Sequence, residues 1–134
     1  MARRSRAREV ALQVLFEDDL NPGRNPAHAD EFVERRLAGE ALVEFARLLV
    51  AGVRRNRPEL DQVLAATAEN WSLDRMAAAD RNVLRLGAFE ILHTETPRSV
   101  AINEAVQLAK RYGAAHSSQF VNGILDRIGK NADC

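Results

Sequence analysis

The chain is organised around Pro97-Arg-Ser-Val-Ala-Ile-Asn-Glu-Ala-Val-Gln-Leu-Ala-Lys-Arg-Tyr-Gly113 and the Ser117-Ser-Gln-Phe-Val-Asn-Gly-Ile-Leu-Asp126 segment that follows it. The first segment repeats apolar residues at helical spacing, namely Ile102, Ala105, Val106 and Ala109. We expect Ser99 to cap this helix and Gly113 to end it in the left-handed conformation. The stretch therefore predicts two helices joined by a short loop.

The second of these helices contains a glycine where a helix does not favour one. Ser117 is placed to act as its N-cap, and Phe120, Ile124 and Ile128 form one apolar row. Gly123 interrupts the helix at a cost of about 1 kcal/mol relative to alanine. This cost predicts that another backbone approaches closely at that point.

Composition indicates a single all-α domain. The chain has 134 residues, of which 46% are hydrophobic and 5% aromatic, with four prolines and seven glycines. No apolar run is long enough to span a membrane, and the basic N-terminus lacks the apolar region of a signal peptide. The single cysteine, Cys134, cannot form an internal disulfide. We expect a cytoplasmic protein.

About seven helices are expected, five of them outside the opening pair. The periodicity places the first of these after the N-terminal arginines and up to about residue 20, and the others near residues 30–37, 40–56, 58–67 and 79–92. Pro58 should separate the third from the fourth. The helices should form two subdomains, residues 1–57 and 58–129, with a loose tail at 130–134. We expect Trp71 to pack over the joint between them.

The N-terminus carries the strongest local charge in a chain whose net charge is zero. Residues 1–8 hold four arginines and no acid, and Arg4 and Arg8 are one helical turn apart. Phe16 follows two turns later. A basic stripe with an aromatic ring suits single-stranded RNA, because arginines hold phosphates and a ring stacks a base. The alternative is a solvated N-terminus with Phe16 in the core.

Catalytic and metal-binding patterns are missing from the sequence. His28, His93 and His116 are far apart and have no cysteine nearby, so we expect no metal site and no cofactor. Carboxylates at Asp74 and Asp80 have the spacing of helix caps or of a partner surface rather than of an acid–base pair. The chain is therefore not expected to be an enzyme.

Three blocks of sequence, in order, resemble the NusB family. They are Arg-Arg-Ser-Arg-Ala-Arg-Glu-Val-Ala-Leu-Gln-Val-Leu-Phe, then Trp-x-Leu-Asp-Arg-Met with Asp-Arg-Asn-Val-Leu-Arg-Leu-Gly-Ala-Phe-Glu-Ile-Leu, and then the opening stretch. The resemblance implies two helical subdomains without catalytic activity. It also implies binding to box A RNA together with NusE, a small-subunit ribosomal protein, in the RNA polymerase antitermination complex.

The resemblance also assigns site residues. It implies RNA contacts at Arg4, Arg6 and Arg8, with Arg3 just outside the motif, and at Phe16, His116, Ser117, Gln119 and Phe120. It implies NusE contacts at Asp74 and Asp80. The chain departs from the family at Ser5, which is often basic, and at His116, which is an acid in some relatives. Phe16 and Phe120 suit either RNA stacking or the core.

Two other functions remain open at this point. NusB-like domains also begin some RNA cytosine methyltransferases, although a natural chain ending at Cys134 would exclude that reading. A protein–protein adaptor without RNA binding is the second alternative. The sequence is compatible with a monomer or with a homodimer that hides the RNA face.

Overall fold

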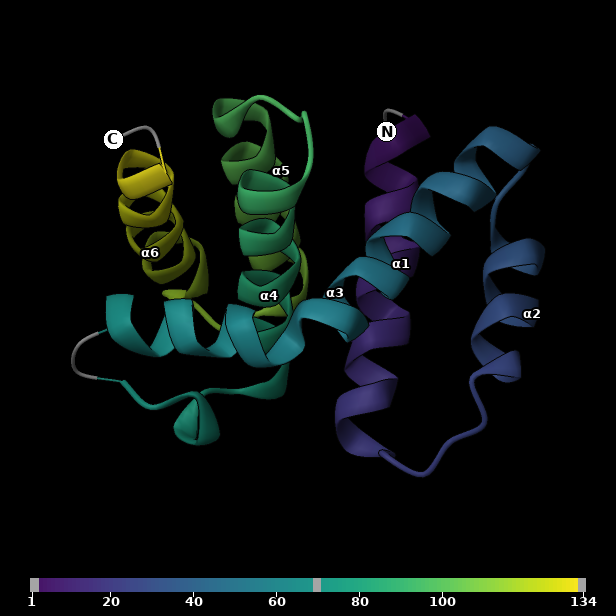
Figure 1. Ribbon diagram of the computed structural model, residues 1–134, viewed down its shortest axis with the longest axis horizontal. Helices are drawn as coiled ribbons and strands as arrows, with labels where there is room; N and C mark the ends of the chain where they lie inside the picture. The colour runs from purple at the N-terminus through teal and green to yellow at the C-terminus, as the bar shows by residue number, and fades with distance from the viewer. Residues whose placement is uncertain (1–2, 69–70, 133–134) are drawn as a thin grey trace.

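A computed structural model describes residues 3–68 and 71–132 and confirms the all-α class. Its elements, in order, are α1 (Arg3–Leu20), α2 (Ala27–Arg36), α3 (Glu40–Thr67), the 3-10 turn η1 (Leu73–Arg75), α4 (Ala78–His93), α5 (Arg98–Tyr112) and α6 (Ser117–Ala132). Figure 1 shows α1, α2 and the first part of α3 on one side, and α4, α5 and α6 on the other. In the described residues there are six α-helices rather than seven.

The missing helix boundary is the one expected at Pro58. Pro58 lies inside α3, which is continuous across the predicted subdomain border at 57/58. Proline removes one backbone hydrogen bond and bends a helix, and α3 changes direction partway along its length (Figure 1). Buried leucines on both sides, Leu49 and Leu60, keep both halves of α3 on the core. Their burial outweighs the proline penalty of about 3 kcal/mol.

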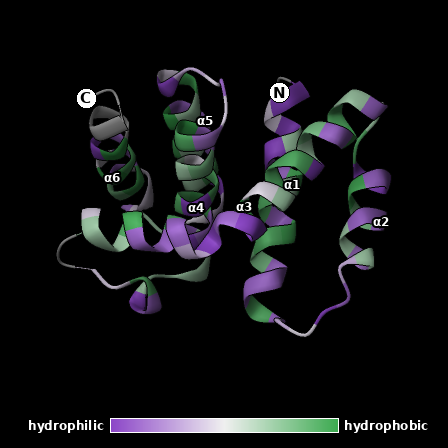
Figure 2. Cartoon of the chain, in the orientation of Figure 1, coloured by the Kyte–Doolittle hydropathy of each residue, from purple (hydrophilic) through white to green (hydrophobic). Residues whose placement is uncertain are grey.

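The core is built around α4. Every residue from 82 to 90 is buried, and α4 packs against α1, α3, α5 and α6. Helices α2, α3, α5 and α6 bury one side each, whereas α1 is buried all round over residues 7–12. Polar as well as apolar residues lie along α1 (Figure 2). A single apolar cluster spans both halves of the molecule. No helix in the described ranges is long and apolar enough to cross a membrane.

Two glycines in the middle of described helices lie against a side chain of another helix, but Gly123 is not one of them. A Cβ on Gly52 would collide with the Phe89 ring, and a Cβ on Gly87 would lie 2.6 Å from Leu125. These two glycines let α3 approach α4, and α4 approach α6. Within the described structure a Cβ on Gly123 would meet no atom within 4 Å. The expectation of a close neighbour at Gly123 was therefore wrong.

Helix ends also differ in detail from the predictions. Ser99 lies inside α5, which begins at Arg98 without a side-chain cap. Gly113 is extended, with φ −94°, and a Cβ there would lie 2.5 Å from Ser117. Ser117 is the first residue of α6, and its Oγ accepts the backbone N–H of Ala114 at 2.8 Å. The helix continues to Ala132 where a tail was expected; residues 133–134 lie outside the described part.

Candidate functional site

The arginines of α1 point to different sides of the helix. Arg3 and Arg4 are exposed, and the Arg4 guanidinium lies 4.5 Å from the centre of the Phe45 ring on α3. Arg6 is partly exposed and forms an ion pair with Glu9 one turn later. Arg4 therefore faces α3 and Arg6 faces α5. The predicted stripe is split into two parts.

Arg8 projects on the same side as Arg4, as the one-turn spacing predicted, since their guanidinium groups lie 5.2 and 4.5 Å from the centre of the Phe45 ring, but Arg8 is buried rather than exposed to solvent. Its side chain is 4% exposed, and its Nε and Nη2 donate to the two carboxylate oxygens of Glu90 at 2.7 and 2.9 Å. Its Nη1 lies 3.5 Å from Glu104, which also accepts the Ser5 hydroxyl at 2.6 Å. Arg8 is drawn inward because α4 presents a buried carboxylate that needs a cation. Arg8 and Ser5 thus join α1 to α4 and α5.

A second guanidinium, missed by the sequence reading, completes the exposed cationic group. Arg111 at the end of α5 lies 2.7 Å from Glu9, and its side chain is 55% exposed. Glu9 is buried and is shared by Arg6 and Arg111. Two cations on one buried carboxylate leave a net positive charge at the surface. The sequence places Arg111 at a helix end, where it also complements the dipole, and nothing in its spacing links it to Arg6.

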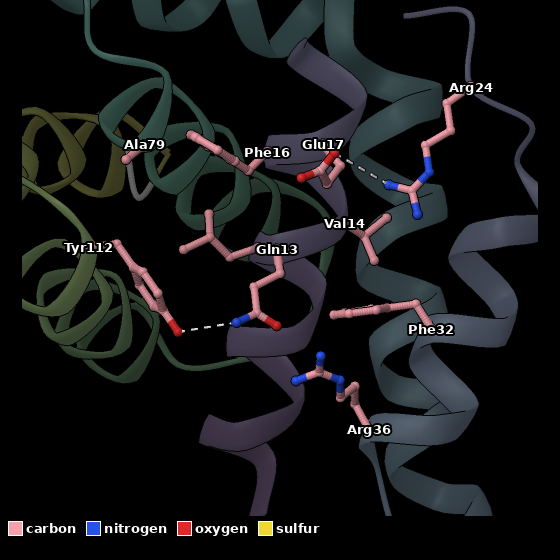
Figure 3. Close-up of a pocket in the computed structure, with 10 residues that line it drawn as sticks. Gln13, Val14, Phe16, Glu17, Arg24, Phe32, Arg36, Ala79 and Tyr112 are labelled. Atoms are coloured by element: carbon pink, nitrogen blue, oxygen red, sulfur yellow. Dashed lines mark hydrogen bonds and ion pairs between the residues drawn. The ribbon is translucent and has the colours of Figure 1, made fainter. Parts of the chain in front are cut away.

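Beside this group lies a hollow of about 520 Å³ between α1, α2, α4 and α5 (Figure 3). The residues that line it include Gln13, Phe16, Phe32, Ala79 and Tyr112. Gln13 Nε2 donates to the Tyr112 hydroxyl at 3.4 Å, whereas Gln13 Oε1 is buried without a hydrogen-bond partner within the described chain. Burial, together with the nearby Glu9 charge, raises the pKa of Tyr112. Phe16 is thus half-buried at the edge of a hollow.

The start of α6 contributes exposed polar groups and one aromatic ring. His116 and Gln119 are exposed, whereas Ser117 is buried and holds the preceding loop. Phe120 is half-buried and meets Trp71 edge to face, with ring centres 5.5 Å apart. Trp71 is 56% exposed, so it does not act as the buried anchor that was expected.

The two predicted partner-binding acids lie next to these residues. Asp74 is exposed on η1, and Asp80 lies in the first turn of α4. A hollow of about 480 Å³ is lined by Asp80, His116 and Phe120 among others. Ala79 lines the hollow that contains Phe16, so the start of α4 separates the two hollows. Asp80 and the start of α6 therefore line one hollow, and Asp74 precedes Arg75, which lines the same hollow.

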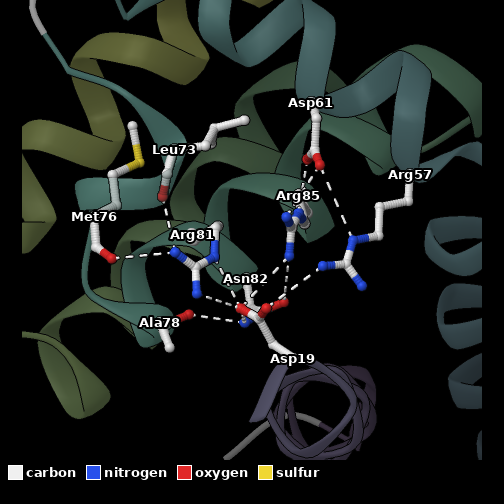
Figure 4. A network of polar contacts seen from close by, with 9 residues as sticks. All are labelled: Asp19, Arg57, Asp61, Leu73, Met76, Ala78, Arg81, Asn82 and Arg85. Carbon is white, nitrogen blue, oxygen red and sulfur yellow. Dashed lines mark hydrogen bonds and ion pairs between the residues drawn. The ribbon is translucent and has the colours of Figure 1, made fainter. Parts of the chain in front are cut away.

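A polar network holds this surface against α1 (Figure 4). Arg81 donates from Nε to Asp19 at 2.8 Å and from Nη1 to the carbonyl oxygen of Leu73 in η1 at 2.8 Å. Asn82 and Arg85 also face Asp19, at 3.0 and 3.6 Å. Burial raises the pKa of Asp19, but the hydrogen bonds from Arg81 and Asn82 and the arginine charges outweigh it, so the pKa is lowered. This network positions η1, and with it Asp74.

Comparison with known proteins assigns the family. The family model described as NusB family matches residues 5–130. The chain is 44% identical over 128 residues to the transcription antitermination protein NusB of Anaeromyxobacter dehalogenans, covering 95% of this chain and 90% of that protein. It matches NusB of T. maritima with a TM-score of 0.86 and 36% identity, over 96% of this chain and 92% of that one.

A second solved structure contains partners. It is a complex of the antitermination factors NusB and NusE with double-stranded RNA, and one of its chains matches this protein with a TM-score of 0.85 and 33% identity, over 98% of both chains. Sequence and structure agree over nearly the full length of the relatives. The chain therefore belongs to the NusB family.

Proposed function

We propose that this protein is a non-catalytic transcription antitermination factor that binds box A RNA together with NusE in the cytoplasm. The observation that carries the proposal is the cationic group of Arg6 and Arg111 on Glu9, beside the hollow that contains Phe16. Arginines provide salt-dependent contacts to phosphates, and neighbouring rings can stack unpaired bases. The likeness to a NusB chain from a complex with NusE and RNA supports the same conclusion.

The proposed RNA path follows the exposed groups. Phosphates are held by Arg3, Arg4, Arg6 and Arg111, while Phe16 and Phe120 offer their rings to bases. His116 and Gln119 at the start of α6 extend this path. The buried residues of the predicted site, Arg8 and Ser117, position α1 and the loop before α6 rather than touching phosphate.

The proposed NusE surface contains Asp74 and Asp80. Their carboxylates suit a basic ribosomal protein, because opposite charges steer association and fix the orientation of the complex. This surface shares a hollow with His116 and Phe120. NusE bound there would lie beside the RNA path, so the two proteins could read one strand jointly.

The test is fluorescence anisotropy of a labelled box A RNA titrated with this protein, alone and with NusE, beside a scrambled RNA. We expect tighter binding to box A than to the scrambled RNA, and a further increase with NusE. Equal, salt-sensitive binding to both RNAs would mean that the protein makes only sequence-independent contacts through its basic N-terminal segment. Binding of NusE without any RNA binding would favour the protein–protein adaptor instead.

A further inference from the structure

Trp71 is the single tryptophan of the chain, and its indole ring is 56% exposed beside α6. The ring meets Phe120 with an interplanar angle of 68°. Edge-to-face contact restrains the orientation of both rings without burying either. A large flat ring is thus held at the surface, where its apolar area remains available to a ligand.

Hollows lie on both sides of this aromatic pair. One has a volume of about 480 Å³ and the other about 250 Å³. Both are lined by the same three residues, Trp71, Gln119 and Phe120. The larger hollow also reaches Arg75 and His116, and the smaller one reaches Arg127. The two rings form a ridge with an amide and a cationic group on each side.

Gly123 independently indicates that the smaller hollow has room for a ligand. It lines this hollow, and a Cβ added to it would meet nothing within 4 Å among the described residues. A glycine inside a helix lowers stability, and packing within the described chain does not require this one. Its missing side chain leaves the floor of the hollow open for the approach of a ligand.

The polar groups around the ridge suit a nucleic acid strand. Arg127 donates from Nη1 to the carbonyl oxygen of Thr67 at 3.0 Å, which fixes the guanidinium while other N–H groups remain available. Arg75 is exposed on η1. Asp80 lines the larger hollow and repels phosphate, so a base rather than a phosphate fits there. Aromatic rings with flanking cations are the usual elements of single-stranded RNA binding.

We propose that Trp71 and Phe120 form a stacking platform for two unpaired bases of the bound RNA, one in each hollow. Arg75 and Arg127 hold the adjoining phosphates, and Gln119 donates to or accepts from a base edge. The inference rests on the proposed function and extends the RNA path beyond the start of α6. It adds Trp71 as a contact that neither the sequence nor the resemblance assigned.

The first experiment uses Trp71 as its own reporter. Box A RNA is titrated into the protein, with and without NusE, while tryptophan emission from Trp71 and anisotropy of the labelled RNA are recorded in parallel. Because NusE can contribute its own emission, the complex is also measured with the Trp71→Phe variant and the difference is taken. We expect Trp71 emission to be quenched with the same midpoint as the anisotropy change. A duplex of the same sequence should quench less, since its bases are already stacked.

Variants then test the energetic contribution. Trp71→Ala should weaken box A binding by about fivefold to a hundredfold, whereas Trp71→Phe should retain most of the affinity. The slope of affinity against salt should not change in either, because stacking releases no counterions. Gly123→Ala should weaken binding while stabilising the fold. Leu48→Ala, which removes another half-exposed apolar side chain on α3, is the matched control and should leave binding unchanged.

The outcomes separate this inference from the proposed function. RNA binding without tryptophan quenching, and with less than a twofold effect of Trp71→Ala, would overturn the stacking platform and leave the function standing. Weaker NusE binding in Trp71→Ala, with RNA affinity of the isolated protein intact, would assign the ridge to the protein partner and also overturn it. Absence of RNA binding by the wild-type protein under both conditions would reject the proposed function itself.

Discussion

Arg8 of α1 and Glu90 of α4 form a two-pronged ion pair in the interior, with N–O distances of 2.7 and 2.9 Å. Both side chains are almost completely shielded from solvent. The arginine-rich segment therefore contains residues of two kinds. Arg8 holds the first helix to the central one, while Arg3, Arg4 and Arg6 are left for the surface.

The Arg8→Ala variant should be strongly destabilised. Removing the cation leaves Glu90 buried without its partner, which costs about 3–5 kcal/mol. Arg4→Ala, which loses a cation–π contact with Phe45, should cost less than about 1 kcal/mol. Urea unfolding followed by circular dichroism measures both free energies. The double variant Arg8→Met with Glu90→Leu should recover most of the loss, and similar losses in Arg8→Ala and Arg4→Ala would contradict the assignment.

Arg6→Ala should weaken binding to box A RNA and reduce its dependence on salt. Each lost phosphate contact to a single strand should lower the slope of log affinity against log salt by about 0.7. Anisotropy titrations at several salt concentrations measure that slope. Arg35→Ala, an exposed arginine on α2, makes the same change in net charge and should leave the slope unchanged. Equal salt slopes for Arg6→Ala and Arg35→Ala would contradict a phosphate contact by Arg6.

The free energy of unfolding should depend on pH in the acidic range because of Asp19. Its folded pKa is lowered below the ordinary value of 3.8, so the unfolded chain binds more protons between the two values. The contribution of Asp19 is complete above about pH 5 and is lost as the pH falls through the folded pKa.

Asp19→Asn should thus lower the free energy of unfolding at neutral pH, and its difference from the wild-type protein should shrink towards acid pH. Urea unfolding at a series of pH values measures this difference. Glu31→Gln, at an exposed position on α2, is the control and should differ little from the wild-type protein at any pH. A constant offset between Asp19→Asn and the wild-type protein would show that the Asp19 charge is not involved.

The same substitution should have opposite effects at two glycines. Gly52→Ala places a Cβ against the Phe89 ring and should destabilise the protein by about 1–3 kcal/mol. Gly123→Ala places a Cβ in open space and should stabilise it by up to about 1 kcal/mol. Thermal unfolding of the two variants compares them directly. Destabilisation by Gly123→Ala would show that the helix needs glycine for another reason.

His116→Asp should weaken RNA binding. His116 is exposed at the start of α6, and an acid there would repel phosphate by about 1 kcal/mol at a separation near 4 Å, which corresponds to about fivefold in affinity. The effect should grow as the salt concentration falls, because less salt screens the charge less. His116→Gln serves as the uncharged comparison in the anisotropy assay. Equal affinities for His116→Asp and His116→Gln would remove His116 from the RNA path.

Local periodicity was sufficient to predict most of the fold. The all-α class and the approximate extent of α1, α5 and α6 follow from apolar spacing, because a helix repeats its buried face every three to four residues. The order of the sequence blocks was sufficient to identify the family. These features depend on residues close together in the chain.

What the sequence by itself determined was therefore the class of helices, the family and the types of residue available for RNA binding. Only the tertiary structure decided which of these residues reach the surface. Arg8 turns inward because Glu90, 82 residues away, needs a cation, and Arg111 joins Arg6 because both reach Glu9. Burial of Leu49 and Leu60, on either side of Pro58, keeps α3 a continuous helix. Each of these outcomes depends on residues distant in sequence. The free energy of the contacts with those residues outweighs the local conformational preference of the chain.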